Sequence, residues 1–222
     1  MLSCDLLICD CDGVLVDSEP LAARAMVALL NETGTAATTA MIAECIGMKQ
    51  ADILAHLADR TGSAIDPSVP DRLWPATRAL FGRELVAVAG ARAVIAAITA
   101  PRCVASSSHV ERIRFSLAAT GLSDLFGEAI FSSQMVRRGK PAPDLFLHAA
   151  RAMGIEPARC VVVEDSVPGV VGAVAAGMTA IGFTGGSHLD ERHAAALTAA
   201  GAAHVAAHWQ EVGRLLGVDV PA

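Results

Sequence analysis

Two aspartates, Asp10 and Asp12, directly follow the apolar run 6–9. Because they are two residues apart, both carboxylates can point the same way where a strand ends. Ligands bind at the carboxyl edge of a parallel sheet, and two carboxylates there need a cation or a shared proton. Gly13 permits a turn that lets backbone amides approach an anion. We therefore expect a ligand-binding or catalytic turn, with a plain Asp-x-Asp-Gly turn as the alternative. The apolar residues 14–16 exclude an EF-hand loop.

A second acidic pair, Glu164 and Asp165, follows the apolar run 161–163. If this strand neighbours the one before Asp10, Asp10 and Asp165 can share a hard cation. Oxygen ligands from few protein groups suit Mg²⁺. Acids that favour the dipole at a helix start are the alternative. That alternative explains Asp165 better than a glutamate that is still inside the strand.

Two further segments carry groups that could bind an anion. Lys140 lies in a loop stiffened by prolines, where it could offset the carboxylates and bind phosphate. Ser106 and Ser107 end another predicted strand before a helix, and hydroxyls at a helix N-terminus form an anion site. An ordinary surface loop and a simple helix cap are the alternatives. Because these segments all follow strands, they are expected at the same edge of a sheet.

The elements that must position these groups alternate along the chain. Apolar runs that read as buried parallel strands lie at 6–9, 103–105, 161–163 and 179–183. Helical patterns, each followed by a glycine, lie at 110–120, 144–153, 168–176 and 189–200. This alternation predicts an α/β fold with a Rossmann-like, doubly wound parallel sheet.

One interval, 18–86, shows helical pattern but no strand. Ser18, followed by an acid and a proline, predicts a helix capped by the serine hydroxyl. Further helices are expected at 49–60 and 71–81, and the α/β pattern resumes with a helix over 89–98. We therefore expect a helical cap domain, 18–86, inserted into a Rossmann-like core formed by 1–17 and 87–222.

Composition excludes several classes of protein. The net charge of −6 disfavours nucleic acid and anionic membranes as partners. The six cysteines form no CxxC pair and read as buried free thiols. No signal peptide and no membrane-spanning run is found, so a cytoplasmic protein is expected. A monomer is the default expectation.

The four motifs, taken in order, resemble those of the haloacid dehalogenase superfamily over essentially the whole chain, and by pattern its β-phosphoglucomutase-like subfamily. The matching residues are Asp10, Asp12 and Gly13 for the first motif, Ser106 for the second, Lys140 for the third, and Glu164 with Asp165 for the fourth. The insert resembles the family's small helical cap. Within the subfamily, the arrangement is similar to that of bacterial sugar-phosphate and 6-phosphogluconate phosphatases.

This resemblance implies a Mg²⁺-dependent phosphohydrolase. Asp10 would be the nucleophile that forms an aspartyl-phosphate, and Asp12 the acid and base. The implied catalytic residues are Asp10, Asp12, Ser106 and Lys140. The implied metal ligands are Asp10, Asp12 through its carbonyl, Glu164 and Asp165. The implied substrate-binding residues are Cys11, Gly13, Ser107 and, in the cap, Gly47 and Lys49.

The same resemblance leaves the reaction open between two enzymes. A phosphatase of small metabolites, such as sugar or sugar-acid phosphates, shares every core residue with a β-phosphoglucomutase. Mutases of this subfamily carry a histidine and an arginine in the cap, where Ala22 and Gln50 stand here. This difference favours the phosphatase. A non-catalytic phosphometabolite sensor is disfavoured, because no core carboxylate is lost.

Overall fold

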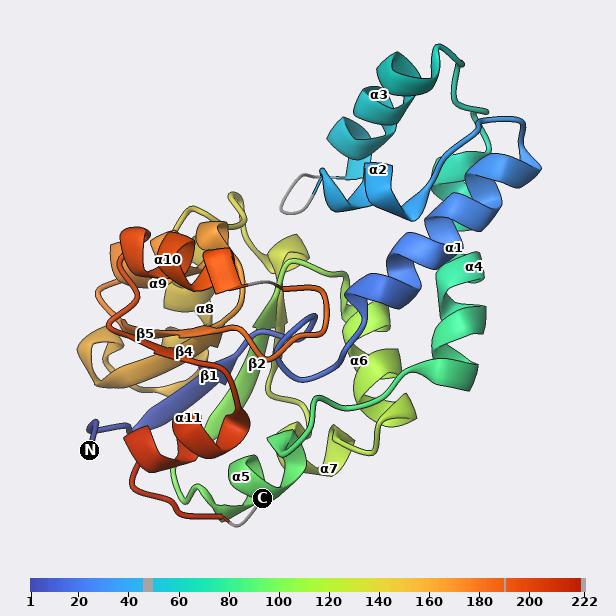
Figure 1. Ribbon diagram of the computed structural model, residues 1–222. Helices are drawn as coiled ribbons and strands as arrows, with labels where there is room; N and C mark the ends of the chain where they lie inside the picture. Colours follow the sequence, from blue (N-terminus) through green and yellow to red (C-terminus); the bar gives the residue numbers. More distant parts are fainter. Residues whose placement is uncertain (46–49, 190, 221–222) are drawn as a thin grey trace. The chain divides into compact units, whose positions relative to one another are not determined.

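The computed structural model describes residues 1–45, 50–189 and 191–220. The chain divides into two compact units (Figure 1). The core unit comprises Met1–Asp17 and Val86–Ala222, and the helical unit is Ser18–Leu85. The chain re-enters the core unit at Val86, whereas 87 was the expected position. Among the described residues, no helix is both long and apolar enough to cross a bilayer.

The core unit is built on a six-stranded sheet in the order β3-β2-β1-β4-β5-β6, in which every neighbouring pair is parallel. Its strands are β1 Leu6–Cys9, β2 Arg102–Ser106, β3 Ile130–Ser132, β4 Cys160–Glu164, β5 Thr179–Phe183 and β6 His204–Ala206. This is the strand order of a Rossmann-like sheet, so the predicted fold class is confirmed.

The two edge strands, β3 and β6, were missed by sequence reasoning. Each has only three residues. β6 begins with the exposed His204, and β3 ends in Ser132, so neither contains a continuous apolar run. Short edge strands of this kind gain their structure from pairing with a neighbour and not from a pattern of their own.

Helices cover both faces of the sheet (Figure 1). On one face lie α8 Asp144–Met153, α9 Val167–Ala175 and α10 Glu191–Ala199; α5 Ala91–Ala97 and α11 Trp209–Leu215 lie on the other. After β2 come α6 Val110–Ala119 and α7 Ser123–Phe126, and the short 3₁₀ turns are η1 Ser133–Met135 and η2 Pro157–Arg159. Alternate residues Leu6 and Ile8 of β1 pack with Phe146 and Val170 in one buried cluster.

The α5 helix is shorter than the predicted 89–98. Gly90 precedes its first residue with a left-handed backbone, φ 80, which a helix interior does not allow. The chain therefore turns at Gly90 before the helix can begin. The helix predicted over 144–153 has the observed bounds, and the other predicted helices of the core differ from the observed ones by one or two residues at an end.

The helical unit contains α1 Glu19–Glu32, α2 Thr39–Ala43, α3 Gln50–Thr61 and α4 Val69–Glu84. Its own core is formed mainly by leucines and a methionine, among them Met26, Leu29, Leu30, Leu57 and Leu73. Ser18 does precede α1, but its side chain makes no capping hydrogen bond, contrary to expectation. The reason is its helical backbone (φ −91, ψ −28), since a capping side chain reaches the first turn from an extended backbone.

Candidate active site

The point where strand order reverses, between β1 and β4, brings the two acidic motifs together. Cys9 is in register with Val163, and the Asp10 amide donates to the Val163 carbonyl at 3.0 Å. Asp10 and Asp165 therefore follow adjacent strands, which was the condition for a shared cation. Ligands bind at such a switch point in open α/β sheets.

Lys140 connects three strand ends at this edge. Its side chain is 4% exposed, and Nζ donates to Asp10 Oδ1 at 2.5 Å, to the Ala105 carbonyl at 3.0 Å and to Glu164 Oε1. The ammonium also lies 5.2 Å from the centre of the Phe146 ring on α8. The loop lysine expected from the sequence is thus a buried cation between two carboxylates.

Glu164 faces this lysine and not an open site. Its carboxylate is fully buried, and Oε2 accepts from the amide and the hydroxyl of Ser166 at 2.8 and 2.9 Å. A Cβ on Gly169 would lie 1.9 Å from Oε1, so glycine is what lets α9 pack onto the carboxylate. Glu164 was expected to be a metal ligand. Both of its oxygens accept hydrogen bonds, and its contact with Lys140 orients that ammonium; its role as a metal ligand stays a prediction.

The charge at Asp10 is incompletely balanced by Lys140. Burial raises the pKa of Asp10 well above its ordinary value of 3.8; Lys140 opposes the rise, and Glu164, Asp165 and Asp12 add to it. Burial would lower the pKa of the Lys140 ammonium, but Asp10 and Glu164 raise it above the ordinary value. The cluster as a whole therefore favours an added proton or an added cation.

This pKa shift predicts an unusual pH dependence of stability. Because the folded state binds the Asp10 proton more tightly than the unfolded state, the contribution of Asp10 to the free energy of unfolding should fall as pH rises from about 3.8 through the raised pKa. Urea unfolding of the wild-type protein and of Asp10→Asn, with chelator present, measures the free energy of unfolding across this range. The difference between wild type and Asp10→Asn isolates the contribution of Asp10. An identical pH dependence in the two proteins contradicts the shift.

Gly13 makes room for Asp165. Its backbone is left-handed, φ 78, and a Cβ there would lie 1.9 Å from Asp165 Oδ2. The Gly13 amide itself donates to the Val16 carbonyl at 2.8 Å. That this turn brings other backbone amides to an anion stays a prediction. Glycine is needed here for the positive φ and for the approach of the carboxylate.

Two histidines contact Asp165, and sequence reasoning gave neither a role. His188 Nε2 lies 3.5 Å from Asp165 Oδ2, and His193 Nε2 lies 2.5 Å from the Asp165 carbonyl. The loop that carries His188 is tied down by Ser187, whose amide and hydroxyl donate to Asp17 Oδ1. The sequence feature that places this loop near the site is its position directly after β5, at the same edge of the sheet.

Asp12 is held by two residues of the segment after β2. Ser108 Oγ donates to Asp12 Oδ2 at 2.6 Å, and Arg112 Nη2 donates to Oδ1 at 2.8 Å. Sequence reasoning missed Arg112 because its spacing is that of any charged residue on a surface helix. The sequence feature that could have indicated Arg112 is its position in the first turn of the helix after β2.

Ser106, Ser107 and Cys11 lie beside these groups. The Ser106 hydroxyl is buried and accepts from the Ser108 amide at 3.1 Å, whereas Ser107 is exposed. Burial raises the pKa of the Cys11 thiol well above its ordinary value, so it is uncharged. Phosphate binding by these three residues stays a prediction. All six cysteines are free, and five of them are buried, whereas Cys4 is half-buried.

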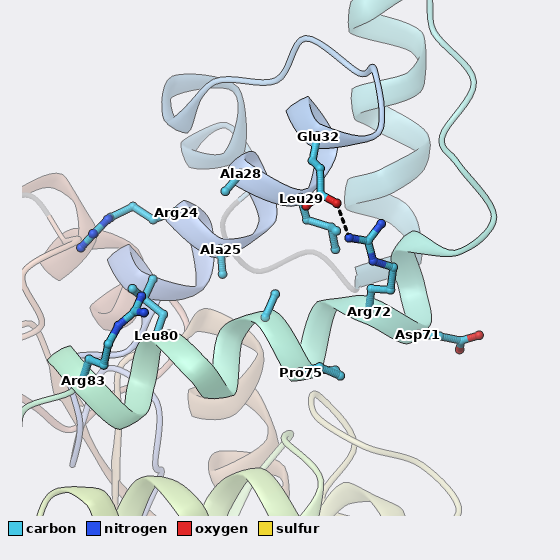
Figure 2. A pocket seen from close by; sticks show the side chains of 11 residues that line it. Arg24, Ala25, Ala28, Leu29, Glu32, Asp71, Arg72, Pro75, Leu80 and Arg83 are labelled. Atoms are coloured by element: carbon cyan, nitrogen blue, oxygen red, sulfur yellow. Dashed lines mark hydrogen bonds and ion pairs between the residues drawn. The ribbon is translucent and has the colours of Figure 1, made fainter.

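The helical unit has a recess of its own, of about 550 Å³, between α1 and α4 (Figure 2). Small and apolar residues, among them Ala25, Ala28 and Pro75, form its lining together with five charged residues. Arg24 and Arg83 project at one end, and the Arg72–Glu32 ion pair at the other (Figure 2). None of the acidic core residues lines this recess. The predicted cap residues Gly47 and Lys49 lie outside the described residues.

Within the described part of the chain, no three His, Cys, Asp or Glu side chains are grouped so that they could hold a metal ion. The predicted ligand set of Asp10, the Asp12 carbonyl, Glu164 and Asp165 therefore stays a prediction. Asp12 and Glu164 are engaged by Arg112 and Lys140. Asp10 is likewise paired with Lys140, and Asp165 lies near His188. These two carboxylates follow adjacent strands, and Mg²⁺ sites complete such a pair with backbone oxygen and water.

Comparison with known proteins adds independent information. A family model described as haloacid dehalogenase-like hydrolase matches residues 4–177. The chain is 34% identical over 181 residues to the 6-phosphogluconate phosphatase of Escherichia coli (strain K12), covering 81% of this chain and 82% of that protein. The crystal structure of a haloacid dehalogenase-like protein of unknown function from Agrobacterium tumefaciens str. C58 matches with a TM-score of 0.86 at 38% identity, covering 96% and 98% of the two chains. A HAD family hydrolase from Deinococcus radiodurans R1, crystallised with phosphate and sodium, matches with a TM-score of 0.82 at 34% identity over 100% of both chains.

Proposed function

This chain belongs to the haloacid dehalogenase-like hydrolases, and we propose that it is a phosphatase of small phosphorylated metabolites, of the sugar-phosphate or sugar-acid-phosphate class. The observation that carries the proposal is the buried Lys140 bridge between Asp10 and Glu164, at the reversal of strand order. It holds a carboxylate nucleophile in place where ligands bind. The 6-phosphogluconate phosphatase of Escherichia coli, named above, supports the substrate class.

The residues present fit a Mg²⁺ ion. Four carboxylates, Asp10, Asp12, Glu164 and Asp165, surround one edge of the sheet, and burial already disfavours the ionised form of Asp10. Gly13, which lacks a side chain, leaves space at the Asp165 carboxylate. Asp10, Asp165 and the Asp12 carbonyl would hold the ion. When bound, Mg²⁺ would offset the negative charge and bind a phosphate oxygen.

Asp10 is the nucleophile in this proposal. Lys140 holds Oδ1, so we assign the attack to Oδ2. The bond from phosphorus to the leaving oxygen breaks as the Asp10–phosphorus bond forms, which gives an aspartyl-phosphate. Lys140 keeps its charge throughout, because the two carboxylates that surround it raise its pKa.

Asp12 moves the protons in both steps. It gives a proton to the leaving alkoxide when phosphate is transferred to Asp10. It then takes a proton from the water that breaks the Asp10–phosphorus bond and releases phosphate. The buried hydroxyl of Ser106 and the exposed Ser107 would contact phosphate oxygens.

Release of inorganic phosphate from a panel of sugar and sugar-acid phosphates tests the proposal. The panel includes 6-phosphogluconate and β-glucose 1-phosphate, each with Mg²⁺ and with EDTA. We expect release from one or a few members with Mg²⁺ and a near-complete loss with EDTA, because the carboxylate cluster then repels a phosphate dianion. Undiminished turnover in EDTA rejects the metal. Accumulation of glucose 6-phosphate from the 1-phosphate, without phosphate release, identifies a mutase instead.

A further inference from the structure

We propose that Arg112, together with Ser108, is a positioning residue that holds the carboxylate of Asp12 in place for its proton transfers. The inference rests on the proposed phosphatase function. Arg112 binds Oδ1 of Asp12 and Ser108 binds Oδ2, at 2.8 and 2.6 Å. With a separate donor on each oxygen, rotation of the carboxylate about its Cβ–Cγ bond is restricted.

The contact is partly buried, which strengthens it. The side chains of Arg112 and Asp12 are 20% and 13% exposed, whereas the Arg114–Glu128 pair on the same helix is 52% and 83% exposed. Charge-assisted hydrogen bonds are stronger than neutral ones, and they gain further when water is excluded. An exposed ion pair contributes little. Arg112 and Arg114 therefore differ in environment although they are two residues apart.

The backbone of Ser108 is fixed by the neighbouring strand. The Ser132 hydroxyl, fully buried at the end of β3, donates to the Ser108 carbonyl at 2.7 Å. The Ser108 amide donates to Ser106 Oγ, and the Ser133 hydroxyl donates to the Ser107 carbonyl. A series of hydrogen bonds thus leads from β3 to the carboxylate of Asp12, and it uses the hydroxyls of Ser132, Ser106 and Ser108.

Arg112 is placed by the start of α6. The helix begins at Val110, so Arg112 lies in its first turn, beside the fully buried Ile113. Residues two apart on a helix do not share a face, which is why Arg114 points to solvent and pairs with Glu128. Arg114 is accordingly a matched control on the same helix.

Arg112 acts through Asp12 in this proposal, so its loss should affect only the steps that need Asp12. A sugar alkoxide requires a proton as it leaves, but p-nitrophenolate leaves without one. Attack of Asp10 on p-nitrophenyl phosphate should therefore be insensitive to Arg112. The subsequent hydrolysis of the aspartyl-phosphate needs Asp12 as base and should be slowed for both substrates.

The experiment compares Arg112→Met, Arg112→Lys and Arg114→Met in the full chain with Mg²⁺. The substrates are the best sugar phosphate from the panel and p-nitrophenyl phosphate. The reaction with p-nitrophenyl phosphate is monitored after rapid mixing, so that a burst of p-nitrophenolate can be seen. For the sugar phosphate, Arg112→Met should lower kcat by roughly 10- to 100-fold, a part of what acid–base catalysis contributes, with little change in KM. With p-nitrophenyl phosphate it should show a fast burst of p-nitrophenolate followed by slow turnover. Arg112→Lys should recover part of kcat, and Arg114→Met should match wild type.

Several outcomes overturn the inference. If Arg112→Met matches Arg114→Met on both substrates, Arg112 is dispensable. If it raises KM with kcat unchanged, Arg112 is a substrate ligand. An equal loss of the burst and of sugar-phosphate turnover would also contradict action through Asp12. If Arg112→Met fails to fold, Ser108→Ala provides the same test, with the same pattern expected at smaller amplitude. A wild-type protein that releases phosphate from no substrate rejects the proposed function itself, and with it this inference.

Discussion

Asp10→Asn is expected to lower phosphate release by at least about a thousandfold, the scale on which enzymes lose kcat when a nucleophile is removed. The amide has the shape of the carboxylate, so the packing of Asp10 against β4 should persist. The amide oxygen of the variant can still accept a hydrogen bond from Lys140, which in the wild-type protein donates to Asp10 Oδ1. What is lost is the charged oxygen that attacks phosphorus.

The stability of the variant separates this effect from unfolding. Because Asp10 is buried among other carboxylates and its pKa is raised, a neutral amide should leave Tm unchanged or higher at neutral pH without metal. Circular dichroism and thermal melts check this, together with phosphate release. Asp5→Asn, which removes a carboxylate paired with Arg159 just before β1, is the control and should keep full activity. An Asp10→Asn protein with wild-type turnover, shown by mass spectrometry to be free of deamidation, rejects Asp10 as nucleophile.

Local pattern was sufficient for the centre of the fold and not for its edges. β1 and β4 are buried on both faces, so each is a continuous apolar run that ends in an acid. β3 and β6 have three residues each, and only pairing with a neighbour makes them strands. The cap was recognisable because helical periodicity continued where strands should have appeared.

The residue types of the site were predictable, but their pairings were not. A strand followed by an acid fixes where Asp10, Glu164 and Asp165 emerge, since this depends only on the parallel sheet. Which donor each carboxylate meets depends on side-chain directions set by packing. Nothing in the sequence around Glu164 shows that Lys140 reaches it from a loop 24 residues away. The contact between Asp12 and Arg112 spans 100 residues, and the position of Arg112 in the first turn of a helix does not show which carboxylate it meets.

Lys140→Met is expected to reduce both activity and stability, because it removes the cation between two buried carboxylates. Methionine fills a similar volume beside Phe146, so the loss is mainly electrostatic. Breaking a buried pair by removing one partner costs about 3–5 kcal/mol in the free energy of unfolding. We expect this loss in urea unfolding at neutral pH, and phosphate release at least about a hundredfold lower, as for loss of one preorganised electrostatic group.

A second substitution distinguishes the charge of Lys140 from its shape. Adding Glu164→Gln to Lys140→Met removes one of the two carboxylates that have lost their cation. The double variant should therefore regain much of the lost free energy of unfolding. It should not restore activity, because Asp10 still lacks the cation that orients it. Glu164→Gln alone leaves Lys140 paired with Asp10 and serves as the reference. If Lys140→Met is as stable as wild type, or the double variant is no more stable than Lys140→Met, Lys140 does not balance this cluster. In that case the negative charge around Asp10 is offset by an added proton or by the bound cation.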